Sequence, residues 1–387
     1  MQRDAEDTRS QNVLAELYLR RVHESGNEDY LPLALNAART SLAAVESERN
    51  VGGLIALAHA EFANHDFVAA RDHALQLAPL RPGKSDSYAI LADASLELGD
   101  YDRATEALQQ LEKMDPGNAG TETRLARLAI LRGDPKAAQQ HFEAALRLLE
   151  NLQEPAAESN AWCHWQMGET AFSIGDGKAA EQHYREALAA VPDYFRALFS
   201  LGRLFAARGD LPTAIDYYER GIRITPAIDA MATLGDLYHL SGREREAAAR
   251  YELVEQLGEH SRKVHGTPFD RHIALFYADH DLRPEEAYAL ARGEYDAGRH
   301  DIYGADALAW TALKSGRIAE AQSALKEALK LNTLDARLLY HAGMVARAAG
   351  EKAAALDYLQ RALTLNPGFD PLQSKVATET LKSLTAL

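Results

Sequence analysis

Histidine and aspartate side chains gather in one segment of the sequence, where they could bind a metal ion. Five of the 14 histidines lie within residues 260–300, and aspartates are interleaved with them. Neutral imidazole and carboxylate groups together bind zinc and other divalent ions. On a helix, His272 and His280 would lie on broadly similar faces two turns apart, too far to share one ion without loop ligands. We therefore predict no metal site, with His272 and His280 as the weak candidates.

No motif for catalysis accompanies this segment. The sequence has no glycine-rich phosphate loop, no H-E-x-x-H helix and no G-x-S-x-G turn, and its single cysteine excludes repeated cysteine pairs. We predict that the protein is not an enzyme and needs no cofactor. A metal-responsive protein that uses the segment 260–301 is the alternative in which these histidines and aspartates are functional.

Composition limits the possible partners and compartments. The chain carries 57 acidic and 42 basic residues, a net charge of −15, which argues against nucleic acid or an anionic membrane as the main partner. Cys163 is the only cysteine, so it cannot form an intramolecular disulfide, and we expect a packed thiol. No apolar run reaches the ~20 residues of a membrane span, and the first residues lack an apolar signal core. We expect a cytoplasmic protein, or a periplasmic or exported one if a signal peptide has been removed.

One stretch, residues 196–226, shows the unit on which the chain is built. Its sequence RALFSLGRLFAARGDLPTAIDYYERGIRITP contains two helical patterns that meet at Gly209-Asp210. Small residues let two antiparallel helices approach closely, and Pro226 ends the second helix because it lacks an N–H group. The stretch resembles the tetratricopeptide repeat, with its pattern W-x2-L-G-x2-Y, A-x3-F and P. The matching residues are Leu198, Leu201, Gly202, Phe205, Ala214, Tyr218 and Pro226.

The same turn recurs along nearly the whole chain. Six of the nine gaps between successive turns fall within one residue of the 34-residue period of the repeat. The chain therefore resembles bacterial proteins with many tetratricopeptide repeats and no known function. The ten expected turn residues are Gly26, His65, Gly99, Gly133, Gly175, Gly209, Gly242, Leu282, Gly316 and Gly350.

The resemblance implies an all-α fold, an α-solenoid in which antiparallel helix pairs stack into a right-handed superhelix. We expect a flexible N-terminus at residues 1–10 and about ten helix pairs over residues 11–369. Irregularities near 147–160 and 259–272 interrupt the period. Residues 370–387 are expected to form a C-terminal capping helix, with Asp370 as its N-cap and Pro371 at its first position.

The resemblance also implies which side chains line the concave groove, since residues about six and ten before each turn tend to face it. Aromatic residues and arginine dominate binding hot spots, and all three tryptophans fall on these or flanking positions. Aromatic side chains on helices also fill the space between helices, so a core position remains the alternative. The candidate groove residues are Trp162, Trp165, Phe199, Arg203, Asp236, Phe276, Trp310, Tyr340 and Arg347.

From these features we predict a protein–protein interaction scaffold or adaptor that binds a partner segment in its groove. The inner positions carry no lysine or asparagine, so binding of a C-terminal carboxylate through such a clamp is not expected. An assembly subunit, or a soluble partner of a membrane complex that uses its edges and irregularities, is the alternative, and it includes a homo-oligomer.

Overall fold

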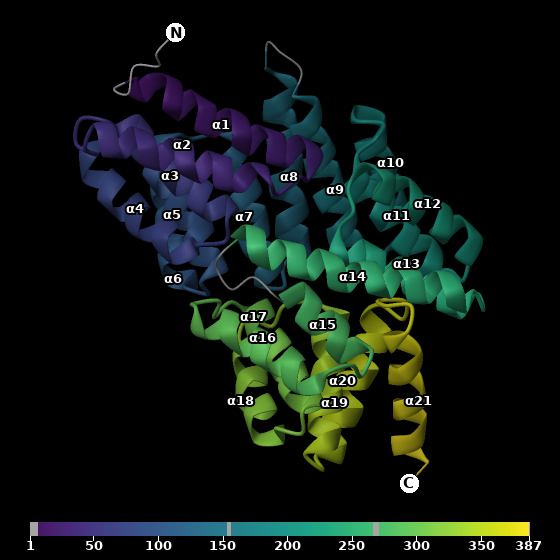
Figure 1. Cartoon of the computed structure of the whole chain (residues 1–387). Coiled ribbons are helices and arrows are strands. Elements are labelled where there is room, and N and C mark those ends of the chain that lie inside the picture. The colour runs from purple at the N-terminus through teal and green to yellow at the C-terminus, as the bar shows by residue number, and fades with distance from the viewer. Residues whose placement is uncertain (1–6, 153–155, 266–270, 387) are drawn as a thin grey trace. The chain divides into compact units, whose positions relative to one another are not determined.

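The computed structural model describes residues 7–152, 156–265 and 271–386, and within these ranges it contains 21 α-helices and no β-strand (Figure 1). This arrangement confirms the all-α solenoid. Residues 1–6 of the expected N-terminus lie outside the described ranges, as do residues 153–155 and 266–270 of the two irregularities.

The helices follow one another along the chain with short connections. The first ten are α1 (Thr8–Ser25), α2 (Tyr30–Ala44), α3 (Val51–Ala63), α4 (Phe67–Leu80), α5 (Asp86–Glu97), α6 (Tyr101–Met114), α7 (Ala119–Leu131), α8 (Pro135–Glu150), α9 (Ala157–Ser173) and α10 (Gly177–Ala190). The others are α11 (Phe195–Ala207), α12 (Leu211–Ile224), α13 (Ile228–Leu240), α14 (Glu244–His265), α15 (Arg271–Asp279), α16 (Pro284–Asp296), α17 (Ile302–Lys314), α18 (Ile318–Ala328), α19 (Ala336–Ala348), α20 (Lys352–Leu365) and α21 (Gln373–Thr385).

The turn within each helix pair has a left-handed residue, as expected from the turn glycines. Nine of the ten expected turn residues have a positive φ, between 62° at His65 and 80° at Gly209 and Gly316. The eighth turn differs, because Asp281 and Arg283 carry the positive φ there in place of Leu282. Without a glycine, this turn uses an aspartate, whose short polar side chain tolerates the left-handed region.

An aspartate follows five of the ten turns and caps the second helix of the pair. In α8, for example, Asp134 accepts a hydrogen bond of 2.9 Å from the backbone N–H of Ala137. The cap satisfies a backbone donor that the first helical turn leaves unpaired. The same cap is formed by Asp66, Asp100, Asp176 and Asp210. At the C-terminus, Asp370 accepts hydrogen bonds from the backbone of Leu372 and Gln373, where α21 begins.

In the pairs α9/α10 and α11/α12, the helices pack closely because a glycine of the first helix faces a tyrosine of the second. A Cβ atom at Gly168 would lie 2.4 Å from Cε1 of Tyr184, and one at Gly202 would lie 2.6 Å from Cδ2 of Tyr218. Both tyrosines are buried. A larger residue at either glycine would therefore push the two helices apart.

The chain divides into two compact units. The first comprises Met1–Arg124, Glu259–Phe269 and Asp296–Asp301. Here the end of α14 contacts the connection between α1 and α2, since the Ser261 hydroxyl donates to Glu28 at 3.2 Å. The connection after α16 lies beside α3 to α6, because Arg299 forms an ion pair of 2.9 Å with Glu97. The C-terminal end of α14, which belongs to the second irregularity, therefore packs within this unit.

The second unit comprises Leu125–Gly258, Asp270–Tyr295 and Ile302–Leu387. In it, the connections after α18 and α20 cover the turns of earlier pairs. The Thr333 hydroxyl donates a hydrogen bond to the carbonyl oxygen of Leu131, and the Asn366 amide donates one of 2.8 Å to that of Phe172. Residues about 200 positions apart therefore meet at the edge of the array.

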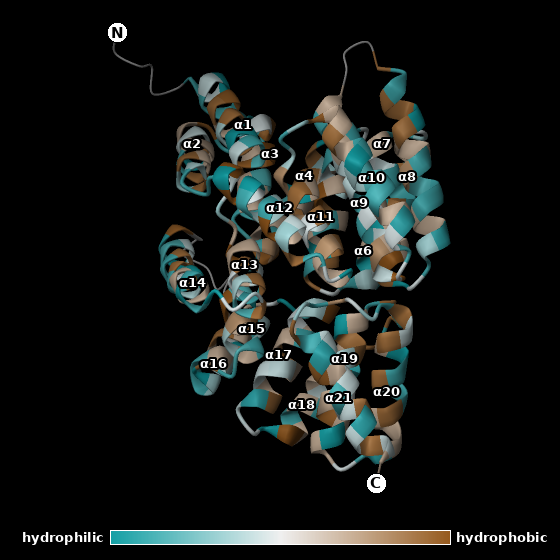
Figure 2. Cartoon of the chain, turned by 90° about the vertical axis from the view of Figure 1, so that its right-hand side faces the viewer, coloured by the Kyte–Doolittle hydropathy of each residue, from teal (hydrophilic) through white to brown (hydrophobic). Residues whose placement is uncertain are grey.

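Hydrophilic residues interrupt the hydrophobic ones along the helices in Figure 2. This pattern is typical of helices that bury one side against their neighbours. Among the described residues, no helix is long and apolar enough to cross a membrane.

Candidate functional site

A partly exposed group of aromatic and arginine side chains lies on α9 and α11. The guanidinium group of Arg196 lies over the rings of Phe195 and Trp165, at 4.6 and 5.7 Å from their centroids. Phe195 and Phe199 are in edge contact at 6.0 Å. All four side chains are half-buried. We call Trp165, Phe195, Arg196 and Phe199 the α9/α11 surface.

A network of hydrogen bonds holds the Trp165 side chain of this surface in place. The Trp165 indole N–H donates to the Ser200 hydroxyl at 3.0 Å, and that hydroxyl donates to Oε1 of Glu169 at 2.7 Å. Glu169 also accepts a hydrogen bond of 2.8 Å from the Tyr184 hydroxyl and forms an ion pair of 2.6 Å with Arg203. Burial raises the pKa of Glu169, but the Arg203 guanidinium and these hydrogen bonds outweigh burial, so its pKa lies below the usual value. Glu169 is therefore ionised at neutral pH.

Other predicted groove residues lie elsewhere. Trp162 is half-buried and packs on Phe142 of the preceding helix pair, with ring centroids 6.0 Å apart. Arg347 is exposed near the end of α19. Arg203 is half-buried beneath the α9/α11 surface, in the ion pair with Glu169.

The remaining four predicted groove residues lie in the core. Trp310 is 0% exposed, Tyr340 1%, Phe276 4% and Asp236 7%. The Tyr340 hydroxyl donates to Gln373 at 2.6 Å, one repeat further along the chain. In these units the helices and the capping segment cover the side chains that we expected to face a groove. The periodic pattern places such residues on one face of a helix, and only the packing of neighbouring units decides whether that face is open.

His272 and His280, the two weak metal candidates, do not lie together in one cluster of ligands. His272 Nδ1 lies 3.4 Å from Asp229, whereas His280 Nε2 lies 2.8 Å from Asp236. Burial lowers the pKa of His280, but the Asp236 carboxylate outweighs this effect and raises the pKa above its usual value. Each histidine is thus accounted for by its own aspartate.

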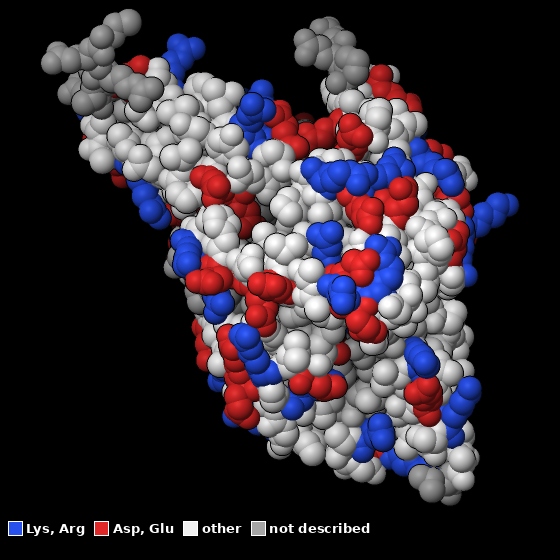
Figure 3. All heavy atoms as spheres, turned by 45° about the vertical axis from the view of Figure 1, so that its right-hand side comes forward, with Lys and Arg blue, Asp and Glu red and all other residues white. Residues whose placement is uncertain are grey.

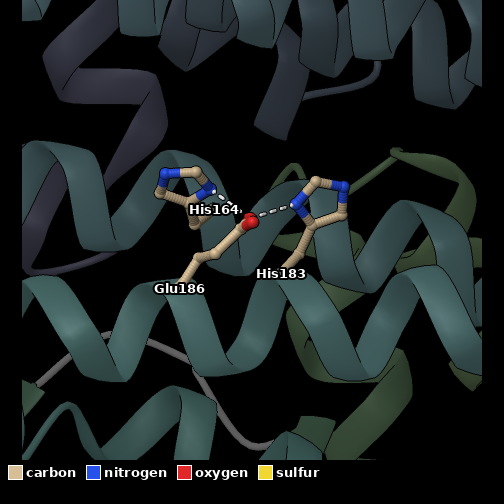
Figure 4. A group of neighbouring side chains, drawn as sticks. All are labelled: His164, His183 and Glu186. Atoms are coloured by element: carbon tan, nitrogen blue, oxygen red, sulfur yellow. Dashed lines mark hydrogen bonds and ion pairs between the residues drawn. The ribbon is translucent and has the colours of Figure 1, made fainter.

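A different group, which we did not predict, has the composition of a metal site. The potential ligand atoms of His164, His183 and Glu186 all lie within 4.8 Å of one another. Figure 4 shows the two imidazole rings on either side of the Glu186 carboxylate. Burial lowers the pKa of His164, and the Glu186 carboxylate only partly opposes this shift. The sequence holds one signal, since His164 and Glu186 each lie eleven residues from the turn residue Gly175.

Comparisons with known proteins bear on the repeat pattern. Two models described as tetratricopeptide repeat match the chain, one at residues 55–119, 166–227 and 307–368 and the other at residues 118–193. Together they cover more than half of it. No curated protein matches the chain.

Two crystal structures are similar to parts of the chain. One is that of MamA, which is 26% identical over 45% of this chain and 97% of that chain, with a TM-score of 0.36. The other is that of PilW, described as a widely conserved type IV pilus biogenesis factor. It is 19% identical over 52% of this chain and 91% of that chain, with a TM-score of 0.44.

Proposed function

The chain belongs to the tetratricopeptide repeat family, and from that premise we propose that it is a non-catalytic scaffold or adaptor that holds a segment of a partner protein on the α9/α11 surface. The observation that carries this proposal is the partly exposed Arg196, which lies over the rings of Trp165 and Phe195, while the Trp165 indole is fixed by its hydrogen bond to Ser200. Of the predicted groove residues, Trp165 and Phe199 combine partial exposure with membership of this cluster.

The physical properties of the surface suit a protein ligand. Aromatic rings and a guanidinium group bury a large area with few rotatable bonds, so little conformational entropy is lost on binding. The network through Ser200 and Glu169 orients Trp165 before a ligand arrives. We expect a partner segment with apolar side chains to contact the rings and an acidic group to pair with Arg196.

Nucleic acid is not the expected partner. The net charge is −15. On the face shown in Figure 3, acidic and basic side chains are interspersed and form no broad basic area. A phosphate backbone would be repelled by such a chain unless a basic patch concentrated the positive charge.

The test is an affinity pulldown from a lysate of the source organism with the wild-type protein and a Trp165→Ala/Arg196→Ala variant. A matched control is Tyr217→Ala/Arg220→Ala, which removes another aromatic–arginine pair, with a centroid distance of 5.2 Å, from α12. We expect a partner that the wild type and the control retain and the first variant loses. Equal retention by all three proteins, with unchanged circular dichroism, would contradict the proposal.

Assembly through the edges of the array is a second candidate, and one observation favours it. A Cβ atom at Gly209 or Gly242 would meet nothing within 4 Å, so these turns are open. Leu240, 39% exposed, stands next to the second of them. If this edge joins two copies, Leu240→Glu should lower the mass measured by light scattering. A wild-type protein that is monomeric at high concentration would rule out self-assembly.

A further inference from the structure

We propose that His164, His183 and Glu186 bind one divalent transition-metal ion of the zinc class. This site does not depend on the partner-binding surface proposed above. His164 precedes Trp165 in the sequence, but successive residues of a helix point about 100° apart, so the two side chains serve different faces of α9.

The fold of a single helix pair brings the three residues together. His164 belongs to α9, and His183 and Glu186 belong to α10. His183 and Glu186 are three residues apart, so they are neighbours on one face of α10. His164 and Glu186 are equally far from the turn at Gly175, which places them opposite each other in two antiparallel helices. The site therefore requires only the packing of α9 on α10.

The distances between the ligand atoms are close to those that a metal ion imposes. Oε2 of Glu186 lies 3.0 Å from Nδ1 of His164 and 2.8 Å from Nδ1 of His183. Bonds of about 2.0–2.2 Å from zinc to nitrogen and oxygen place two tetrahedral ligands about 3.3 Å apart. The ligand atoms of the two histidines lie within 4.8 Å of each other, so rotation of the two side chains toward a common point would admit the ion.

One nitrogen of the group has an unsatisfied hydrogen-bonding capacity. Nδ1 of His164 is buried, and although it lies near the carboxylate, it makes no hydrogen bond with acceptable direction. Most buried polar atoms in proteins have a partner. A metal ion between the two rings would use the lone pair of this nitrogen.

The donor set indicates the class of ion. Two imidazoles and one carboxylate suit zinc and its transition-metal neighbours better than magnesium or calcium, which prefer oxygen ligands. Three protein ligands leave a fourth tetrahedral position for water or for a side chain of another molecule. The side chains are 17–36% exposed, so the ion could enter from solvent. When bound, it would link α9 to α10.

The experiment is zinc titration of the full chain after removal of metal with a chelator, followed by calorimetry and metal analysis. We expect one equivalent of zinc per chain and a higher Tm with zinc than without it. We expect His183→Ala and Glu186→Gln to lower the affinity at least tenfold. Glu186→Gln keeps the size of the side chain, so it tests ligation even if an alanine variant fails to fold. Cobalt in place of zinc should give the visible absorption of a tetrahedral site.

Matched controls separate this site from adventitious binding by other histidines. His239→Ala removes an exposed histidine that pairs with Glu244 at 3.1 Å, and His272→Ala removes a weak candidate from the histidine-rich segment. Both controls should bind zinc as the wild type does. Absence of stoichiometric binding by the wild type would overturn the proposal, and so would equal affinity in His183→Ala and Glu186→Gln.

Discussion

The indole N–H of Trp310 donates a hydrogen bond of 2.8 Å to Oδ1 of Asp279, one repeat earlier in the chain. The ring stacks on His341 at 4.2 Å, and the side chain is 0% exposed. A residue type that often serves as a binding hot spot thus joins three successive helix pairs at their core.

Replacement of Trp310 by alanine should therefore destabilise the protein. Loss of a buried tryptophan and the cavity it leaves cost about 3–5 kcal/mol. Trp165→Ala removes a half-buried ring and should cost roughly half as much or less. Urea unfolding followed by circular dichroism measures both free energies. A smaller loss in Trp310→Ala than in Trp165→Ala would mean that the core assignment of Trp310 is wrong.

Two turn glycines with nearly equal backbone angles should respond differently to alanine. Gly133 has a φ of 70° and Gly209 one of 80°, so alanine in either turn carries the left-handed penalty of about 1–2 kcal/mol. A Cβ atom at Gly133 would also lie 2.5 Å from the carbonyl oxygen of Asn332, whereas one at Gly209 would meet nothing within 4 Å.

We expect Gly133→Ala to be the more destabilising variant by about 1–3 kcal/mol, because overlap with a backbone atom cannot be relieved by a side-chain rotation. Chemical denaturation of the two variants side by side measures the difference. Equal losses of unfolding free energy in the two variants would show that the Asn332 carbonyl does not restrict the space at Gly133.

The ion pair between Arg203 and Glu169 should stabilise the fold, so the effects of removing the two side chains should not be additive. Both side chains are about one-third exposed or less, at 31% and 26%, and their contact is 2.6 Å. Arg203→Met leaves the carboxylate without its cation, and Glu169→Gln does the reverse. We expect each single change to cost about 1–3 kcal/mol and a double-mutant cycle to give a coupling of about 1–2 kcal/mol. Additive losses in the cycle would contradict the coupling.

The His73–Glu61 pair should make stability depend on pH. The hydrogen bond of 2.6 Å from His73 to Glu61 raises the pKa of His73, and burial only partly opposes it. Because the folded state holds the proton more tightly, the stabilisation is complete below the unfolded pKa of about 6.5 and is lost as pH rises through the folded pKa.

The difference in Tm between the wild type and His73→Gln should accordingly be larger at pH 6 than at pH 9. The comparison of the two proteins at each pH removes the contributions of other titrating groups. A difference that grows with pH would reverse the sign and disprove the raised pKa.

The single cysteine should resist modification in the folded protein. Cys163 is 1% exposed, and burial raises the pKa of its thiol to about 12. Because the thiolate is the reactive form, iodoacetamide at pH 8 should leave the folded protein unlabelled and label it fully in denaturant. Rapid labelling without denaturant would show that α9 opens locally.

Much of the fold could be predicted from local sequence. The 34-residue period, the turn residues and the aspartates that follow them depend on backbone conformation within a few residues, so nine turns appear where they were expected. The eighth turn differs, because no glycine marks it and the positive φ falls on Asp281 and Arg283, on either side of Leu282. Asp370 accepts hydrogen bonds from the backbone N–H groups of Leu372 and Gln373, but α21 begins only at Gln373, with Leu372 and not Asp370 at its N-cap.

The candidate sites needed contacts between helices. His164, His183 and Glu186 are scattered among fourteen histidines and many acids in the sequence, and only the packing of α9 on α10 sets their distances. By contrast, His272 and His280 are close together in the sequence, but in the structure each pairs with a different aspartate.

The sequence by itself determined the repeat, the helix pairs and the family, because each follows from periodicity and turn chemistry that act over short distances. Tertiary structure alone decided which aromatic residues are accessible. Trp165 lies ten residues before Gly175 and Trp310 six before Gly316. Both positions were expected to face the groove, yet Trp165 is half-buried and Trp310 has no exposed surface. Burial depends on how much of each helix the following units cover, and that coverage is set by contacts between residues far apart in the chain.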